Sequence, residues 1–387
     1  MLLLIVIYMI YIGSGLHSYL LGAAWPSIYQ EMGVSDTLLG ILSTIMICTM
    51  IVANLFSANL LKRFGVGTII GTCMLLMGIC ATGFALSGSF IVLCIFAVPL
   101  GLALGSIDAV LNNFMAIHFK ARHMNWLHCF WGIGATVGPI ILAGSMTIFG
   151  TWRAGYFSVS GVQYAIAILL FLTLPLWKKA PAMNENPQPQ ELIKVNYSEV
   201  FRLRGIKLSL IAFFFYCALE FTVALWGPLY LVMVKTVSEE HAAQLISFVF
   251  LGMTLGRLLA GFMTIKLNNL SLIRFGSALI LIGIILMYVS TSDAGYISGF
   301  LIMGVGFGPI WPCLVHETPR RFGEAYSQSV VGLQLVSSNI GNALAPLFFG
   351  AITPLVGYAV LPLYLLILLI VTFITIEAQR LNKTLTS

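Results

Sequence analysis

Three charged residues lie inside long apolar stretches of the sequence: Asp108, Glu220 and Arg257. A charge near the middle of a membrane is costly, so each one marks a candidate functional site. Asp108 shares a helix face with Gly105 and Asn112, and its stretch supplies no basic partner. A buried carboxylate without a partner favours its protonated form. Asp108 is therefore a candidate for proton coupling or substrate binding, and the alternative is a permanently protonated side chain that hydrogen-bonds a neighbouring helix.

Glu220 raises the same expectation in a second stretch, where it shares a helix face with Tyr216. Arg257 stands toward one end of its stretch, where a long side chain reaches the membrane surface, so we expect a structural or gating role. The expected chemistry is proton transfer and solute binding rather than catalysis. The sequence presents no nucleophile–base cluster and no set of metal ligands, so we expect neither an enzyme nor a metal protein.

The composition shows why a charged residue in an apolar stretch of this chain is significant. Of the 387 residues, 59% are hydrophobic and 8% are charged, whereas a soluble protein is about 45–50% apolar and about 25% charged. These values exclude a soluble enzyme, a disordered chain and a nucleic-acid-binding domain, and they make the lipid bilayer the solvent for most of the surface. The seven cysteines lie in apolar runs without metal-site spacing, so a disulfide framework is not expected either.

Twelve stretches are long and apolar enough to cross a membrane as helices. They are residues 2–27, 37–58, 67–87, 90–117, 125–148, 154–176, 208–234, 243–264, 273–291, 294–316, 326–350 and 359–377. Membrane strands are excluded because the runs are too long and do not alternate. We therefore expect an all-α integral membrane protein.

The basic residues give the expected orientation. Sixteen of the nineteen lysines and arginines fall in one set of loops, and the other set holds only Arg153 and Lys235. By the positive-inside rule, both termini are expected on the cytoplasmic side of the cell membrane. The net charge of +6 is then a topology signal, and no nucleic-acid partner is needed to explain it. A polar cytoplasmic linker, 177–207, is expected to separate an N-terminal six-helix bundle, 1–176, from a C-terminal one, 208–387.

The two halves repeat one another. Gly101–Asp108 parallels Gly304–Trp311, and Ile133–Pro139 parallels Ile340–Pro346. This pattern predicts two pseudo-symmetric bundles with a central site between them. Glycines four residues apart, such as Gly101 with Gly105, let helix backbones approach closely, which we favour over a hinge role.

Neutral polar and aromatic side chains complete the candidate pathway. They are His17, Asn112, Gln163, Tyr216, Trp311, Gln334 and Asn339. For each polar one, a hydrogen bond between helices is an equal alternative to substrate contact. His17 is also an alternative proton carrier, since histidine titrates near neutral pH. Trp311 occupies the repeat position of Asp108, where it can stack on a sugar ring or cap the cavity.

Twelve spans arranged as six plus six resemble the major facilitator superfamily. Ala58–Gly65 keeps the Arg63 and Gly65 of that family's motif between the second and third helices, and Gly256 with Arg257 is typical of its eighth helix. The resemblance implies that Arg63 and Arg257 belong to gating or structural elements.

Within that superfamily the chain is similar to the fucose and glucose permease group, through Gly105–Asn112 and Tyr216–Glu220. The resemblance assigns proton coupling to Asp108. Because the group's first-helix Asp is absent and Gly22 precedes Pro26 by four residues, fucose specificity is not implied.

Together these features predict a secondary transporter that works as a monomer and needs no cofactor besides the proton gradient. It would import a sugar or a similar small neutral solute together with protons. The alternative is a proton-driven exporter of drugs or metabolites, because Gly134, Gly138 and Pro139 resemble part of the antiporter fifth-helix motif.

Overall fold

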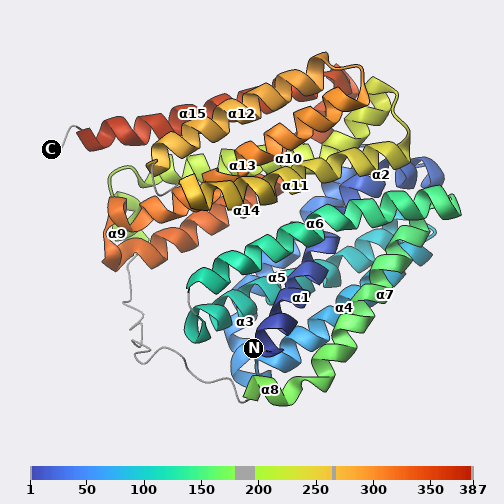
Figure 1. The fold of residues 1–387 in the computed structure, drawn as a ribbon, viewed down its shortest axis with the longest axis horizontal. Coiled ribbons are helices and arrows are strands. Elements are labelled where there is room, and N and C mark those ends of the chain that lie inside the picture. Colours follow the sequence, from blue (N-terminus) through green and yellow to red (C-terminus); the bar gives the residue numbers. More distant parts are fainter. Residues whose placement is uncertain (1, 120, 179–196, 264–266, 385–387) are drawn as a thin grey trace. The chain divides into compact units, whose positions relative to one another are not determined.

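Hydrocarbon offers no partner to backbone N–H and C=O groups, so long apolar segments must form helices in lipid. The computed structural model describes residues 2–119, 121–178, 197–263 and 267–384 (Figure 1). Its helices are α1 Leu2–Ser18, α2 Leu20–Met32, α3 Leu38–Phe64, α4 Val66–Leu86, α5 Phe90–His118, α6 Ala121–Phe149, α7 Trp152–Leu172, α8 Leu174–Lys178, α9 Tyr197–Arg202, α10 Ile206–Lys235, α11 Glu239–Met263, α12 Asn269–Val289, α13 Asp293–Phe322, α14 Glu324–Val356 and α15 Leu361–Thr384, with a 3-10 turn at Tyr358–Val360.

The long helices confirm the predicted all-α membrane fold. Eleven segments of the described chain are long and apolar enough to cross a membrane, and the first of them, Leu2–Met32, combines α1 and α2. The apolar part of α3, Leu38–Asn54, supplies the remaining one of the twelve predicted spans. All regular secondary structure in the described ranges is helical.

The first span is broken, where the sequence predicts one continuous helix. Between α1 and α2, Tyr19 has φ −131° and ψ 10°, outside the helical region. Trp131 of α6 holds both residues at the break: its indole Nε1 donates to Ser18 Oγ at 3.2 Å, and its ring meets that of Tyr19 edge-on, 5.9 Å between centroids. Interrupted membrane helices of this kind occur at the binding sites of transporters.

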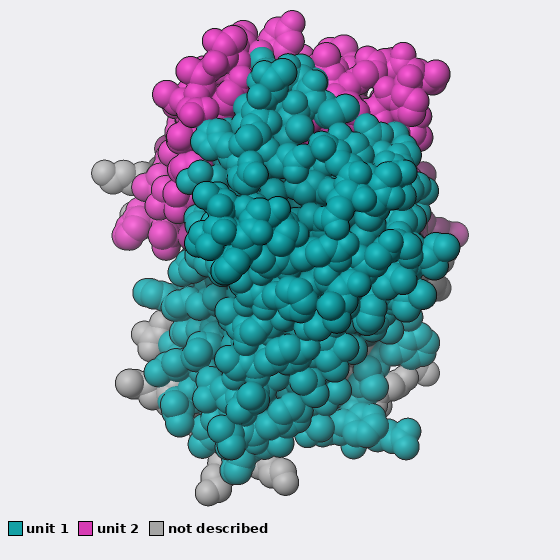
Figure 2. All heavy atoms as spheres, turned by 90° about the vertical axis from the view of Figure 1, so that its right-hand side faces the viewer, with its two compact units in different colours: residues 1–187, 231–247 teal, residues 188–230, 248–387 magenta. Residues whose placement is uncertain are grey.

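The described chain forms two compact units, coloured separately in Figure 2. Unit 1 comprises residues 1–187 and 231–247, and unit 2 comprises residues 188–230 and 248–387. The predicted linker lies mostly in 179–196, outside the described residues, so the predicted boundaries stay a prediction. Its described end forms α9, whose Val200 is buried with Ile206 and Phe322 in unit 2.

Close glycine contacts between α-helices recur in the two units. Gly101 and Gly105 of α5 lie against the α3 backbone, and Gly304 and Gly308 of α13 lie against the α11 backbone. A Cβ atom at any of the four would collide with backbone atoms. The contact therefore repeats between equivalent helices, as the predicted pseudo-symmetry requires.

A second helix pair repeats in the same way. Gly134 and Gly138 of α6 face the carbonyl oxygens of α1, and Gly341 of α14 faces the Phe214 carbonyl of α10. Small residues at these positions bring backbones together where lipid supplies no hydrophobic drive for association. Pro139 is buried within α6 beside Gly138.

Arg153, at the start of α7, forms hydrogen bonds to two other helices at one end of unit 1. Its Nε and Nη2 donate to Glu31 Oε1 at 2.9 and 2.7 Å. Its Nη1 donates to the carbonyl oxygens of Ala85 and Ser87 at 2.6 and 2.7 Å. The guanidinium also lies over the ring of Trp152, 4.7 Å from its centroid. One side chain thus joins α2, the end of α4 and α7.

Candidate functional site

Asp108 of α5 has a neutral partner one helical turn away. The Asn112 amide Nδ2 donates to Asp108 Oδ1 at 2.7 Å, and the Asp108 side chain is exposed. Within the described ranges no ion pair reaches this carboxylate. A carboxylate with only a neutral partner can change its protonation state without leaving a buried counter-charge behind.

Tyr11 of α1 lies within electrostatic range of Asp108, although these residues are far apart in the sequence. Its ring is buried, and its hydroxyl has no hydrogen-bond partner among the described residues. Sequence reasoning missed Tyr11 because a tyrosine in an apolar run is usually a packing residue. Tyr11 therefore joins Asp108 and Asn112 as a candidate in unit 1.

Glu220 of α10 is half-buried in unit 2 and bonded to Tyr216, one turn earlier. The Tyr216 hydroxyl lies 2.8 Å from Glu220 Oε2 and 3.0 Å from the carbonyl oxygen of Phe307. A hydroxyl has one hydrogen, so Tyr216 can donate to only one of them fully. With ionised Glu220 it donates to the carboxylate. With protonated Glu220 the carboxyl group can donate to Tyr216, which then donates to Phe307.

Two other predicted residues lie around Tyr216. The charge of Arg257 acts on the Tyr216 hydroxyl, and the Arg257 backbone contacts α13 at Gly308. Trp311 is half-buried, with ring centroids 5.2 Å from Phe213 and 6.4 Å from Tyr216. Arg257 therefore lies near Tyr216. Its backbone also takes part in the contact between α11 and α13, as a structural role would require.

His17, beside the break in the first span, is almost fully buried together with Gln163 of α7. Gln163 Nε2 lies 2.6 Å from the carbonyl oxygen of Gly13 and 3.1 Å from His17 Nδ1. His17 Nε2 and Gln163 Oε1 have no partner among the described residues. Substrate contact by His17 stays a prediction.

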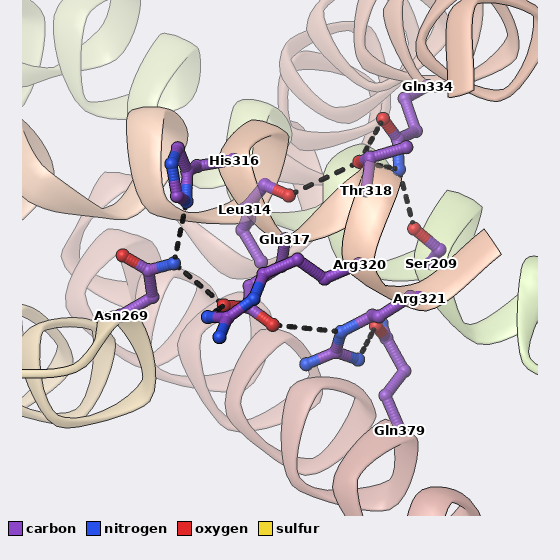
Figure 3. Close-up of polar contacts among 10 residues, drawn as sticks. All are labelled: Ser209, Asn269, Leu314, His316, Glu317, Thr318, Arg320, Arg321, Gln334 and Gln379. Carbon is purple, nitrogen blue, oxygen red and sulfur yellow. Dashed lines mark hydrogen bonds and ion pairs between the residues drawn. The ribbon is translucent and has the colours of Figure 1, made fainter. Parts of the chain in front are cut away.

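Gln334 is buried in a hydrogen-bonded group that joins three helices (Figure 3). Its Nε2 donates to Ser209 Oγ of α10 at 2.8 Å, and its Oε1 accepts from Thr318 Oγ1 of α13 at 3.1 Å. This arrangement supports the helix-packing alternative for Gln334. Asn339, further along α14, is half-buried, and its substrate contact stays a prediction.

Arg63 is exposed at the end of α3, with its guanidinium 5.3 Å from the ring centroid of Phe64. Its gating role stays a prediction. The close packing described above accounts for Gly134 and Gly138.

Glu317 is the centre of a polar cluster that sequence reasoning missed (Figure 3). It accepts from Asn269 Nδ2 of α12 at 2.7 Å and lies 3.4 and 3.8 Å from nitrogens of Arg320 and Arg321. Arg321 in turn donates to Gln379 of α15. The available signal was Glu317 four residues before Arg321, a favourable helix spacing. The cluster ties α12, α13 and α15 together at one end of unit 2.

Comparison with known proteins decides the family. The sequence model of the Major Facilitator Superfamily matches residues 7–346. The chain belongs to this superfamily. It is 24% identical to the cis,cis-muconate transport protein of Acinetobacter baylyi, over 87% of this chain and 84% of that protein. It is 22% identical to the glucose/mannose transporter GlcP of Bacillus subtilis, over 76% of this chain and 74% of that protein.

A solved structure shows the same major facilitator fold. It is a bacterial homologue of the human lysosomal transporter Spinster, with a TM-score of 0.78 and 16% identity over 98% of this chain and 97% of that one. The chain is therefore a multi-pass membrane transporter of small molecules, and not an enzyme.

Proposed function

We propose that this chain imports a neutral, hydroxyl-bearing solute, a sugar being the favoured class, together with protons. Solute binds near mid-membrane, and the two halves alternate access to it. The proton gradient supplies the energy, so no cofactor is required. The charge distribution of the loops supports placement in the cell membrane with both termini cytoplasmic, and we propose that the monomer is the working unit.

The environment of Asp108 is the observation that carries the proton-coupling proposal. An ionisable side chain in a membrane span faces a protein interior or a water-filled cavity, because exposure to hydrocarbon is too costly. The exposed Asp108 carboxylate, bonded to neutral Asn112, therefore belongs on a water-accessible surface. There it can take up and release protons during the cycle.

The surroundings of Glu220 support a hydroxylated substrate. A carboxylate accepts hydrogen bonds from hydroxyl groups, and Trp311, beside Tyr216, offers an aromatic face of the kind on which a sugar ring packs. The similarity to a glucose/mannose transporter agrees with this class. The antiport alternative rests on Gly134 and Gly138, whose packing against α1 is compatible with either direction of transport.

A counterflow assay with the purified chain in proteoliposomes tests the substrate class. Labelled D-glucose and D-mannose serve as sugars, labelled cis,cis-muconate as an acid, and a cationic dye as an export substrate. We expect exchange of a monosaccharide. Exchange of the dye without any monosaccharide would favour the exporter, and exchange of muconate alone would replace the sugar with a carboxylic acid.

A further inference from the structure

The His17 and Gln163 side chains form a polar pair inside unit 1, next to the break between α1 and α2. The exposed fraction is 2% for His17 and 0% for Gln163. Gln163 reaches across from α7 to the Gly13 carbonyl of α1, 2.6 Å from its Nε2. The same Nε2 lies 3.1 Å from His17 Nδ1.

These contacts fix the protonation of the His17 ring. The Gly13 carbonyl only accepts, so the amide of Gln163 must present its NH₂ group there. That NH₂ group has no acceptor site, so His17 Nδ1 must be the acceptor, and the ring's single hydrogen is on Nε2. A doubly protonated ring would set an N–H against the amide NH₂. Turning the amide over would instead set its oxygen against the Gly13 carbonyl.

The remaining polar atoms of the pair define what binds there. His17 Nε2, a donor, and Gln163 Oε1, an acceptor, are buried without a partner in the described part of the chain. Buried polar groups are normally hydrogen-bonded, so we expect a bound molecule to supply hydrogen-bond partners for both atoms. A hydroxyl group donates and accepts at once. A carboxylate only accepts and would face the Gln163 oxygen, and an ammonium group only donates and would face the His17 N–H.

No ion pair within the described ranges involves the His17 ring. Titratable side chains on α1 and on the helices packed against it include Tyr11 on α1, Cys73 and Cys80 on α4, Asp108 on α5, His128 on α6 and Tyr164 on α7. Asp108 acts on Tyr11, and Tyr164 bonds to Thr82. Among the described residues, Gln163 is the side chain that bonds to the His17 ring.

We propose that His17 and Gln163 form a binding site for one hydroxyl group, and that His17 stays neutral throughout transport as an Nε2–H donor. In the chain without substrate the hydroxyl group is that of water. When substrate is bound, either this water remains or a substrate hydroxyl replaces it. His17 is then a positioning or binding residue and not a proton carrier.

Nitrogen NMR of the full chain in nanodiscs, with ¹⁵N-labelled histidine, tests the protonation state. The chain has six histidines, and His17→Gln identifies the signal. If that variant does not fold, Gln163→Met identifies it by shifting its resonance. We expect protonated Nε2 and unprotonated Nδ1 between about pH 5 and pH 8, where an ordinary histidine titrates. Titration of this ring within that range, or a proton on Nδ1, would overturn the proposal.

The occupant is read from magnetisation transfer to the Nε2 hydrogen in the same sample. A signal from water without substrate is expected. Its persistence with added D-glucose identifies water as the permanent occupant, and its replacement by a sugar signal identifies a substrate hydroxyl. The absence of any hydroxyl signal, or a change caused only by cis,cis-muconate, contradicts the hydroxyl site. Because the first readout needs no transport, it stands even if sugar uptake is wrong.

Discussion

The Tyr216 hydroxyl lies 2.8 Å from Glu220 Oε2 and 3.0 Å from the carbonyl oxygen of Phe307. Because the carbonyl is a second acceptor, the hydrogen bond between Tyr216 and Glu220 can reverse its direction when Glu220 takes up a proton. The ionised carboxylate accepts from Tyr216, and the protonated one donates to it. Tyr216 thus serves both protonation states of Glu220 without leaving a buried group unpaired.

The variant Tyr216→Phe removes the hydrogen bond that the Tyr216 hydroxyl donates to the ionised Glu220. A hydrogen bond to a charged group contributes about 1.5–3 kcal/mol, which corresponds to about one to two pH units. Proton release from Glu220 then needs a higher pH, so we expect the pH profile of solute uptake to move upward by about that amount. Uptake rates in proteoliposomes over a pH series measure the shift.

Tyr164→Phe is the matched control for that variant. The Tyr164 hydroxyl bonds to Thr82 Oγ1 at 2.9 Å, and no carboxylate among the described residues bonds to it. Its pH profile should match that of the parent. Equal profiles for both variants and the parent would show that Tyr216 does not act on a titrating group.

Substitution by alanine should affect the thermal stability differently at Gly134 and at Gly144, both of which lie on α6. A Cβ at Gly134 collides with the Ile12 carbonyl of α1, whereas a Cβ at Gly144 meets no atom within 4 Å. Overpacking costs about 1–3 kcal/mol, and alanine is favoured over glycine in a helix by roughly 0.5–1 kcal/mol. Thermal unfolding of the solubilised protein should show a lower midpoint for Gly134→Ala and an unchanged or higher one for Gly144→Ala. Similar midpoints would contradict the close helix contact.

Arg153→Ala removes four hydrogen bonds that join α2, α4 and α7. Because the Arg153 side chain is partly exposed, we expect the free energy of unfolding to fall by about 1–3 kcal/mol, which is less than four separate hydrogen bonds would contribute. Arg153→Lys should recover little, since an ammonium group lacks the planar fork. Arg320→Ala is the control, because that side chain is 67% exposed. The same thermal assay should leave Arg320→Ala unchanged, and an equal loss in both would argue against a special role of Arg153.

The helices and the repeat could be predicted from the sequence because both follow from local pattern. Hydrocarbon requires internal backbone hydrogen bonds, and Asp108 and Asn112 were placed together by helical periodicity alone. Contacts between distant helices could not be predicted in this way. How the helices pack determines the electrostatic influence of Asp108 on Tyr11, the position of Arg257 near Tyr216 and the burial of Gln334. The break at Tyr19 could not be predicted either, because the contact of Trp131 with Ser18 at this break is a tertiary contact between α6 and the first span.

Asp108→Asn gives the most direct measurement of the central claim, which is that this carboxylate couples solute movement to protons. The amide keeps the size and the hydrogen-bonding capacity of the side chain and cannot carry the proton. In proteoliposomes that hold a pH-sensitive dye, the parent should accumulate the solute identified by counterflow and acidify the lumen as it does so. The account predicts that Asp108→Asn still exchanges solute but neither accumulates it nor moves protons. Accumulation and proton movement equal to those of the parent would contradict the account.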